Sequence, residues 1–184
     1  MLSATDPLPV RPRRVLVAGV TGVGKSTLAQ RIGGLSGIRY TEIDALYHGP
    51  DWTVLPTFSA DVDTLAGGDS WITEWQYRSA RDRLARSADT LIWLDYSLVV
   101  TMWRLVRRTL RRRIGRQRLW NGNVEAPLWH FFTGRDHILA WALSTRHSYA
   151  ELVPRAEREN PGLRVVRLRT PAETRAWLTR TFGA

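Results

Sequence analysis

The stretch that decides the fold is Gly19-Val20-Thr21-Gly22-Val23-Gly24-Lys25-Ser26, which fits the pattern G-x-x-x-x-G-K-[ST] at every fixed position. The apolar residues 15–18 precede it and indicate a buried strand. Residues 27–32 follow as the first turns of a helix, which we expect to end at Gly33 and Gly34. In such a loop, glycines let backbone N–H groups turn toward phosphate oxygens, and the helix N-terminus adds positive potential. The stretch therefore predicts a phosphate-binding loop.

The side chains of this loop match the needs of a nucleotide. Lys25 can reach the β- and γ-phosphates, and the hydroxyl of Ser26 can ligate Mg²⁺. Lys25 is also the only lysine of the chain, although the sequence is rich in arginine. A compact ammonium suits a tight loop better than a planar guanidinium does. The residues predicted to bind the nucleotide here are Gly19, Thr21, Gly22, Val23, Gly24, Lys25, Ser26 and Thr27.

Composition restricts the remaining possibilities. A chain of 184 residues with 43% hydrophobic residues is long enough for one domain with a sizeable core. The absence of cysteine excludes disulfides, thiolate metal sites and a thiol nucleophile. The net charge of +10 favours an anionic partner. No signal peptide or membrane span is evident, so we expect a cytoplasmic protein, with residues 1–14 as a flexible tail and 15–184 as the domain.

Acidic residues follow three of the predicted strands. We expect strands over residues 38–43, 71–73 and 90–94, which are followed by Asp44, Glu74 and Asp95. The carboxyl ends of parallel strands share one crevice, so these carboxylates are predicted to lie near the phosphates. On pattern alone, Asp95 is the better match for a metal-side carboxylate and Glu74 is its rival. Each acid could instead cap a strand or helix end.

An arginine-rich helix is predicted over residues 98–114. Its apolar stripe is Val99, Trp103, Val106, Leu110 and Ile114. A second stripe contains Arg104, Arg107, Arg108 and Arg111, which is either a solvated face or a phosphate-binding surface. The four histidines, His48 among them, have no metal-ligand spacing and are interpreted as structural or surface residues.

The C-terminal part completes an alternating pattern. Residues 127–157 are predicted to be helical with a break near His147 or Pro154, and 163–168 to form a last strand. Thr170 and Glu173 form a capping box with Pro171 at the first helical position, which predicts a helix to Thr181. Strands alternating with helices predict a parallel sheet covered by helices on both faces.

Several segments together resemble a known family. They are residues 19–27, Ile43-Asp44-Ala45-Leu46-Tyr47 with Trp52, Trp71-Ile72-Thr73-Glu74 with Tyr77-Arg78, and residues 89–95. On these segments the chain is similar to the adenylate-kinase-related P-loop kinases, in particular the group often labelled "DNA topology modulation protein"-like. The resemblance implies a three-layer α/β/α P-loop fold with a five-stranded parallel sheet of order 2-3-1-4-5. It also implies an Arg-rich helical lid, roughly residues 104–135, and ATP with Mg²⁺ as the phosphoryl donor.

The resemblance also implies roles for individual residues. It places Glu74 with Ser26 on the metal side, Arg78 at the acceptor, and Thr170 with Pro171 near the adenine base. Trp75 stands where relatives carry glycine, so the acceptor site departs from the usual shape.

These observations favour ATP-dependent phosphoryl transfer to a small molecule that is nucleotide-like or contains a ring. The predicted catalytic residues are Lys25, Asp44, Arg78, Arg107, Arg108 and Arg111. Phosphoryl transfer needs mainly positioning and charge stabilisation, which these side chains supply. The alternative is a nucleic-acid-associated P-loop NTPase whose arginine helix contacts phosphate backbone. A third hypothesis is a nucleotide-binding protein without turnover, which holds if Asp44 and Glu74 are misplaced.

Overall fold

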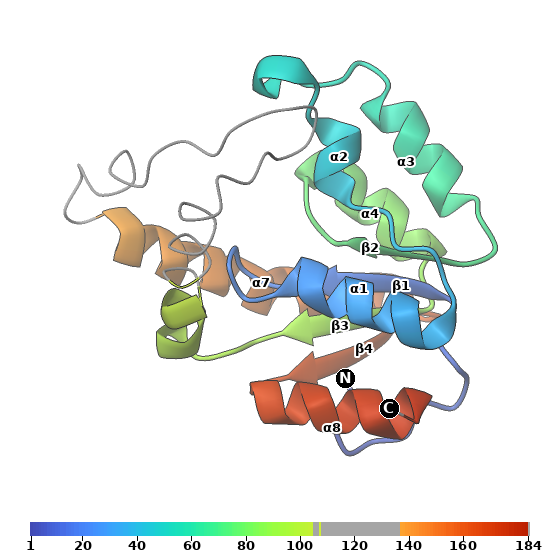
Figure 1. Ribbon diagram of the computed structural model, residues 1–184, viewed down its shortest axis with the longest axis vertical. Helices are drawn as coiled ribbons and strands as arrows, with labels where there is room; N and C mark the ends of the chain where they lie inside the picture. Colours follow the sequence, from blue (N-terminus) through green and yellow to red (C-terminus); the bar gives the residue numbers. More distant parts are fainter. Residues whose placement is uncertain (105–106, 108–136, 184) are drawn as a thin grey trace.

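A parallel sheet lies at the centre of the computed structural model, which describes residues 1–104, 107 and 137–183 (Figure 1). Its strands are β1 (Arg14–Ala18), β2 (Trp71–Glu74), β3 (Thr90–Leu94) and β4 (Arg164–Leu168), in the order β2-β1-β3-β4. The helices are α1 (Lys25–Ser36), α2 (Ile43–Tyr47), α3 (Phe58–Ala66), α4 (Arg78–Ser87), α7 (His137–Glu159) and α8 (Pro171–Phe182), with a 3₁₀ turn η1 at Pro50–Trp52.

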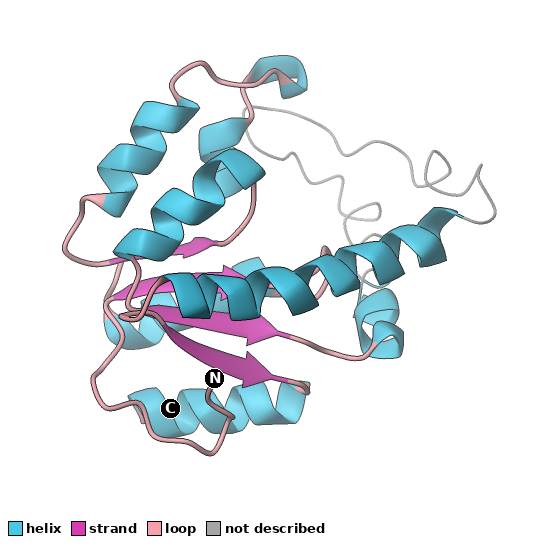
Figure 2. Cartoon of the chain, turned by 180° about the vertical axis from the view of Figure 1, so that it is seen from behind, coloured by secondary structure: helices cyan, strands magenta, loops and turns pink. Residues whose placement is uncertain are grey.

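Helices cover both faces of the sheet (Figure 2). Because side chains alternate along a strand, β1 sends Val15 and Val17 to one face and Leu16 and Ala18 to the other. The first pair packs with α1 and α8, and the second pair packs with α3, α4 and α7. Every residue of β2 and β3 is buried, as expected for strands covered on both sides. The α/β fold with a parallel sheet is thus the predicted one.

The strand predicted over residues 38–43 does not form. Only one bridge pairs Tyr40 with Ile72 of β2, and the chain then turns into α2. The N–H of Ile43 donates to the carboxylate of Glu74 at 3.2 Å, which satisfies an end of α2 that would otherwise be unpaired. The described sheet therefore has four strands, and the predicted five-stranded order is not confirmed.

Two helices extend beyond their predicted ends. Helix α1 passes through Gly33 and Gly34 and ends at Ser36, with Gly37 in the left-handed conformation as its cap. A side chain at Gly33 would lie 3.0 Å from the carbonyl oxygen of Ile38, so this glycine permits close packing rather than ending the helix. Helix α7 continues past His147 and contains Pro154, where a break was predicted.

The first residues, predicted to form a flexible tail, make backbone hydrogen bonds to β4. Leu2 N donates to Val165 O at 2.7 Å, and Arg167 N donates to Leu2 O at 2.8 Å. The N-terminal ammonium also lies 2.6 Å from Glu157. The segment thereby covers the outer edge of β4, where unpaired backbone groups would otherwise be exposed.

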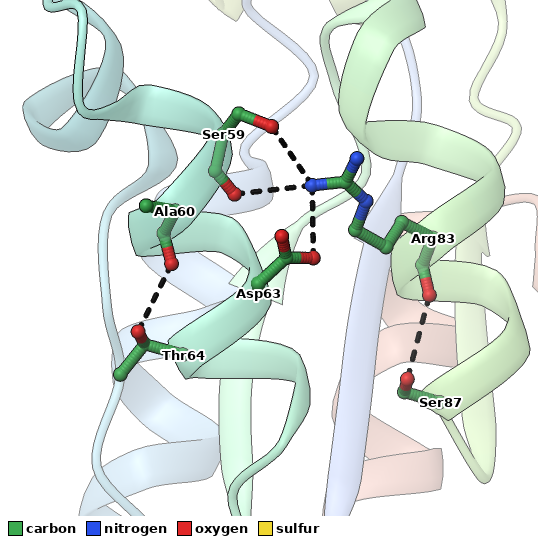
Figure 3. Close-up of polar contacts among 6 residues, drawn as sticks. All are labelled: Ser59, Ala60, Asp63, Thr64, Arg83 and Ser87. Carbon is green, nitrogen blue, oxygen red and sulfur yellow. Dashed lines mark hydrogen bonds and ion pairs between the residues drawn. The ribbon is translucent and has the colours of Figure 1, made fainter.

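An arginine joins α3 to α4 (Figure 3). Nη1 of Arg83 donates to the carbonyl and hydroxyl oxygens of Ser59, at 3.1 and 2.9 Å. The same nitrogen lies 2.8 Å from Asp63 Oδ1. These contacts hold the first turns of α3 against α4. The C-terminal end of the loop between α2 and α3 is thereby fixed, because α3 begins there.

The helix predicted over residues 98–114 is described for 98–104 and 107. Within it, Val99 and Trp103 are 78% and 61% exposed, whereas Thr101 is buried. The predicted apolar stripe is therefore not the inward face here, which instead carries Val100 and Thr101. Val106, Leu110, Ile114, Arg108, Arg111 and nearly all of the predicted lid lie outside the described residues. No helix in the described part is long and apolar enough to cross a membrane.

Candidate active site

The phosphate-binding loop connects β1 to α1 and has the backbone that its glycines were predicted to allow. Gly19 and Gly24 have φ angles of +143° and +108°, which side-chain-bearing residues rarely adopt. A Cβ on Gly19 would also lie 2.8 Å from the carbonyl oxygen of Leu94 at the end of β3. Gly22 has a positive φ as well, while Thr21 and Thr27 are exposed at the loop and first helical turn.

Lys25 lies inside this loop. Its side chain is 8% exposed, and Nζ donates to the carbonyl oxygen of Val20 at 3.3 Å. A buried ammonium needs an acceptor, and here the loop backbone supplies one. A phosphate oxygen bound in the loop would be a stronger, charged acceptor for the same group.

Glu74 lies at the end of β2, beside Val17 of β1, and is 1% exposed. Its Oε1 accepts a hydrogen bond of 2.5 Å from the hydroxyl of Tyr40, and Oε2 accepts from Ile43 N. Burial, followed by the charge of Glu74, raises the pKa of Tyr40, while a hydrogen bond with Ser26 lowers it. The phenol of Tyr40 thus holds Oε1 of Glu74, one of the two predicted metal-side residues. Tyr40 was missed because a lone tyrosine carries no sequence signal.

Ser26 and Glu74 fit Mg²⁺ in the chemistry of their oxygen donors, because this ion favours a few protein oxygens together with phosphates and water. Among the described residues there is no cluster of three or more histidines, cysteines or acids that could hold a metal.

Asp95, the rival of Glu74, has a different environment. Its Oδ2 accepts hydrogen bonds from Arg167, at 3.0 Å from Nε and 2.5 Å from Nη2. The Arg167 guanidinium also lies over the ring of Trp93, 4.5 Å from its centroid. Asp95 is thus held in an ion pair between β3 and β4, which favours a structural role.

Asp44 lies in the first turn of α2 rather than at a strand end. Its Oδ1 accepts hydrogen bonds from Gln76 Nε2 at 2.7 Å and from the hydroxyl of Tyr77 at 2.6 Å. Tyr77 has a φ of +55°, an unfavourable value for an aromatic residue, and strain of this kind is often kept at functional sites. Burial and the hydrogen bond to Asp44 raise the pKa of Tyr77, so its phenol stays a neutral donor.

Aromatic rings pack around Tyr77, the hydrogen-bond partner of Asp44. Tyr47 stacks on Tyr77 with ring centroids 3.9 Å apart, and Phe58 packs edge-on against both. His48 Nε2 lies 3.2 Å from the Tyr77 hydroxyl, and His48 meets Trp52, which is 40% exposed. His48, interpreted from the sequence as a structural or surface residue, therefore belongs to the wall next to Asp44.

Arg78, predicted to act with Asp44, makes no hydrogen bond or ion pair with it in the described structure. Its exposed side chain instead lines a cavity of about 510 Å³ between α4 and α7. Arg81 and Arg155 line the same cavity. Tyr77, the preceding residue, does contact Asp44, and the role predicted for Arg78 at the acceptor stays a prediction.

Arg104 reaches the phosphate-binding loop. Its Nη1 donates to the carbonyl oxygen of Val23 at 2.8 Å, and its guanidinium lies 5.1 Å from the ring centroid of Tyr96. The Tyr96 hydroxyl is 2.6 Å from that of Thr174 in α8. Among the predicted catalytic arginines, Arg107 lies over the exposed ring of Trp103, and Arg108 and Arg111 fall outside the described residues. The sequence grouped Arg104 with the arginine stripe without distinguishing it.

Thr170 and Pro171 form the predicted start of α8. The Thr170 hydroxyl accepts from Glu173 N at 3.1 Å, and the Glu173 carboxylate accepts from Arg169 N at 2.7 Å. The hydroxyl of Thr170 is therefore engaged as a helix cap. The contact between Thr174 and Tyr96 brings this end of α8 close to Arg104, and the adenine contact predicted for Thr170 and Pro171 stays a prediction.

Comparisons with known proteins give information on the fold alone. Models of protein families give no match to this sequence, and neither do curated proteins. Among solved structures, the chain is similar to a gluconokinase from Sinorhizobium meliloti, with 21% identity over 94% of both chains and a TM-score of 0.50. A sugar kinase from Janibacter also matches, with 22% identity over 62% of this chain and 80% of the other, at a TM-score of 0.38. The structural neighbours are thus kinases, and the first supports a P-loop kinase-like fold.

Proposed function

We propose that this chain is a kinase that transfers the γ-phosphoryl group of Mg²⁺-bound ATP to a hydroxyl of a small, ring-containing molecule. One observation carries this proposal. Glu74 pairs with Val17 of β1, the strand that leads into the predicted phosphate-binding loop, and accepts a hydrogen bond from the first residue of the helix that carries Asp44. A nucleotide site and a carboxylate for the acceptor are therefore parts of one connected structure.

The roles of the residues follow from their positions. The loop backbone and Lys25 hold the β- and γ-phosphates, which fixes the phosphorus atom and offsets its charge. Ser26 would ligate Mg²⁺ and Glu74 would hold its water ligands, and the ion supplies charge neutralisation of the transferred group. The ring wall of Tyr47, Tyr77 and Trp52 would bind one face of the acceptor.

We assign two tasks to Asp44, which are to orient the acceptor and to receive its proton. Gln76 and Tyr77 both donate to Oδ1, and no described residue donates to Oδ2. An acceptor hydroxyl can donate its proton to Oδ2 while its oxygen attacks the γ-phosphorus. The new P–O bond forms as the bond to the β-phosphate oxygen breaks, ADP leaves, and the proton goes to Asp44.

The experiment is a screen of nucleosides, nucleotides, sugars and other small metabolites for acceptor-dependent ADP release. We expect the parent to turn over at least one class, and Lys25→Ala and Lys25→Arg to abolish that release, while a cooperative melting curve shows that each variant is still folded. Lys25→Arg tests the fit of the compact ammonium, since an equal charge on a planar group cannot occupy this loop. Undiminished ADP release by Lys25→Ala would contradict the proposal, and a parent that binds ATP without turnover would favour a binding protein.

A nucleic-acid-associated NTPase is the second candidate. It is favoured by the exposed ring of Trp103, which lies 5.2 Å from the guanidinium of Arg107 and could stack on a base. Neutralising Arg107, Arg108 and Arg111 together separates the two functions. A kinase should lose acceptor-dependent turnover while ADP binding changes little, because lid charges act mainly as the phosphoryl group moves. A nucleic-acid enzyme should lose DNA or RNA binding, with a reduced salt slope and nearly normal ATP turnover.

A further inference from the structure

We infer that Tyr40 is a positioning residue that orients the Glu74 carboxylate for its task at Mg²⁺ and, through Glu74, joins the metal side to the acceptor helix α2. The inference rests on the proposed function. It assigns to Tyr40 a task that acts through its neighbours, since the phenol itself need not touch the nucleotide.

The position of Tyr40 is well determined by its surroundings. Its backbone forms the bridge to Ile72, and Thr41 N donates to Ile72 O at 2.9 Å. Its Cβ lies 3.6 Å from the place where a side chain on Gly33 would begin, so α1 packs closely against it. A phenol fixed between β2 and α1 can hold a neighbouring carboxylate in one orientation.

The hydroxyl of Tyr40 acts on Glu74 directly. It donates its proton to Glu74 Oε1 at 2.5 Å. A single phenol thereby fixes one oxygen of the carboxylate that is proposed for the metal side.

Glu74 carries the link onward to the acceptor side. Its second oxygen accepts from Ile43 N at 3.2 Å, and Ile43 immediately precedes Asp44 in α2. With both bonds in place, the carboxylate is held in one orientation. Without the Tyr40 bond, Ile43 N is the one hydrogen-bond donor to Glu74 left among the described residues, so the carboxylate can rotate and should hold a Mg²⁺-bound water less well.

The test is Tyr40→Phe, measured by calorimetric titration of ATP with Mg²⁺ and, separately, in excess EDTA. Loss of an outer-shell partner typically costs about 10- to 100-fold in metal affinity. We expect a decrease of that size in the gain of affinity that Mg²⁺ provides, with the EDTA affinity within about twofold of the parent. Tyr149→Phe is the matched control, because it removes another buried phenol hydroxyl, which donates to Trp75 O at 3.2 Å, and should leave both affinities unchanged.

A second variant keeps the inference testable if Tyr40→Phe proves unstable. Glu74→Gln keeps one of the two acceptor oxygens, replaces the other with an NH₂ group that cannot accept, and lacks the charge, so it should lose the same Mg²⁺-dependent gain. The double variant should lose no more than either single one, because the two residues act as one unit. Equal loss with Mg²⁺ and with EDTA, or additive losses, would overturn the inference and leave Tyr40 as a packing residue. A parent that binds no nucleotide in either buffer would overturn the proposed function as well.

Discussion

Asp44→Asn is the substitution that separates a catalytic carboxylate from a structural one. In the parent, both protein donors meet at Oδ1, and Oδ2 is left for an acceptor hydroxyl. Asparagine can place its carbonyl oxygen at Oδ1 and keep both bonds, while its NH₂ group replaces Oδ2. An amide nitrogen cannot accept a proton. The loss of a positioned base predicts a fall in turnover of about 10²- to 10⁴-fold, with ATP affinity changed less than about threefold.

The same structure bounds the effect on stability. Two hydrogen bonds to a charged acceptor become bonds to a neutral amide, and such an exchange costs roughly 1 kcal/mol for each bond. We therefore expect urea denaturation to show a loss of about 1–2 kcal/mol. Turnover is measured as ADP release with the acceptor that the screen identifies. Asp51→Asn is the control, because it removes the same charge from the neighbouring exposed turn, where asparagine tolerates the φ of +53°. Turnover of Asp44→Asn within about twofold of the parent would refute the reasoning.

Two further predictions concern the loop and Asp95, the rival of Glu74 for the metal side. Gly19→Ala should lower the free energy of unfolding by at least about 2 kcal/mol in urea denaturation, because of its φ and the 2.8 Å approach to Leu94 O. Gly34→Ala, with open space around the added methyl group, should instead be neutral or stabilise α1 by up to about 1 kcal/mol. Equal losses of stability in the Gly19 and Gly34 variants would contradict this account. Asp95→Asn should destabilise the protein by about 1–3 kcal/mol by weakening its pair with Arg167. In the Asp95→Asn variant, the gain in ATP affinity that Mg²⁺ provides should equal that of the parent. Loss of this gain would indicate that Asp95 lies on the metal side.

Local sequence was sufficient wherever one segment determines its own structure. The loop from Gly19 to Ser26, the capping box at Thr170 and the buried strands all depend on residues adjacent in the chain. In these segments propensity, period and turn chemistry agree, and the structure follows them. The ends of β2 and β3 were also predictable, so Glu74 and Asp95 were correctly placed at strand ends.

Contacts between distant segments decided the features that the sequence did not predict. Residues 38–43 have strand-like composition, but the hydrogen bond from Ile43 N to Glu74, formed across 31 positions, starts a helix there. The stripe of Val99 and Trp103 shows another limit of pattern. Periodicity identifies residues that share a face of a helix, but the burial of that face depends on the neighbouring elements. Arg104 and Tyr40 belong to the same class, because only the fold brings them to the loop and to Glu74.

Two carbonyl groups of the phosphate-binding loop accept hydrogen bonds from cationic side chains of the same chain. Lys25 donates to Val20 O, and Arg104 donates to Val23 O. An entering polyphosphate would therefore replace neutral acceptors with charged ones, and the cations need only turn toward it. Hydrogen bonds to charged acceptors are worth about 1.5–3 kcal/mol, compared with about 0.5–1.5 kcal/mol for neutral pairs. This exchange favours the nucleotide-bound state without any buried cation having to become solvated first. Arg104, although distant in sequence, thus contacts the loop backbone in the same way as Lys25 does.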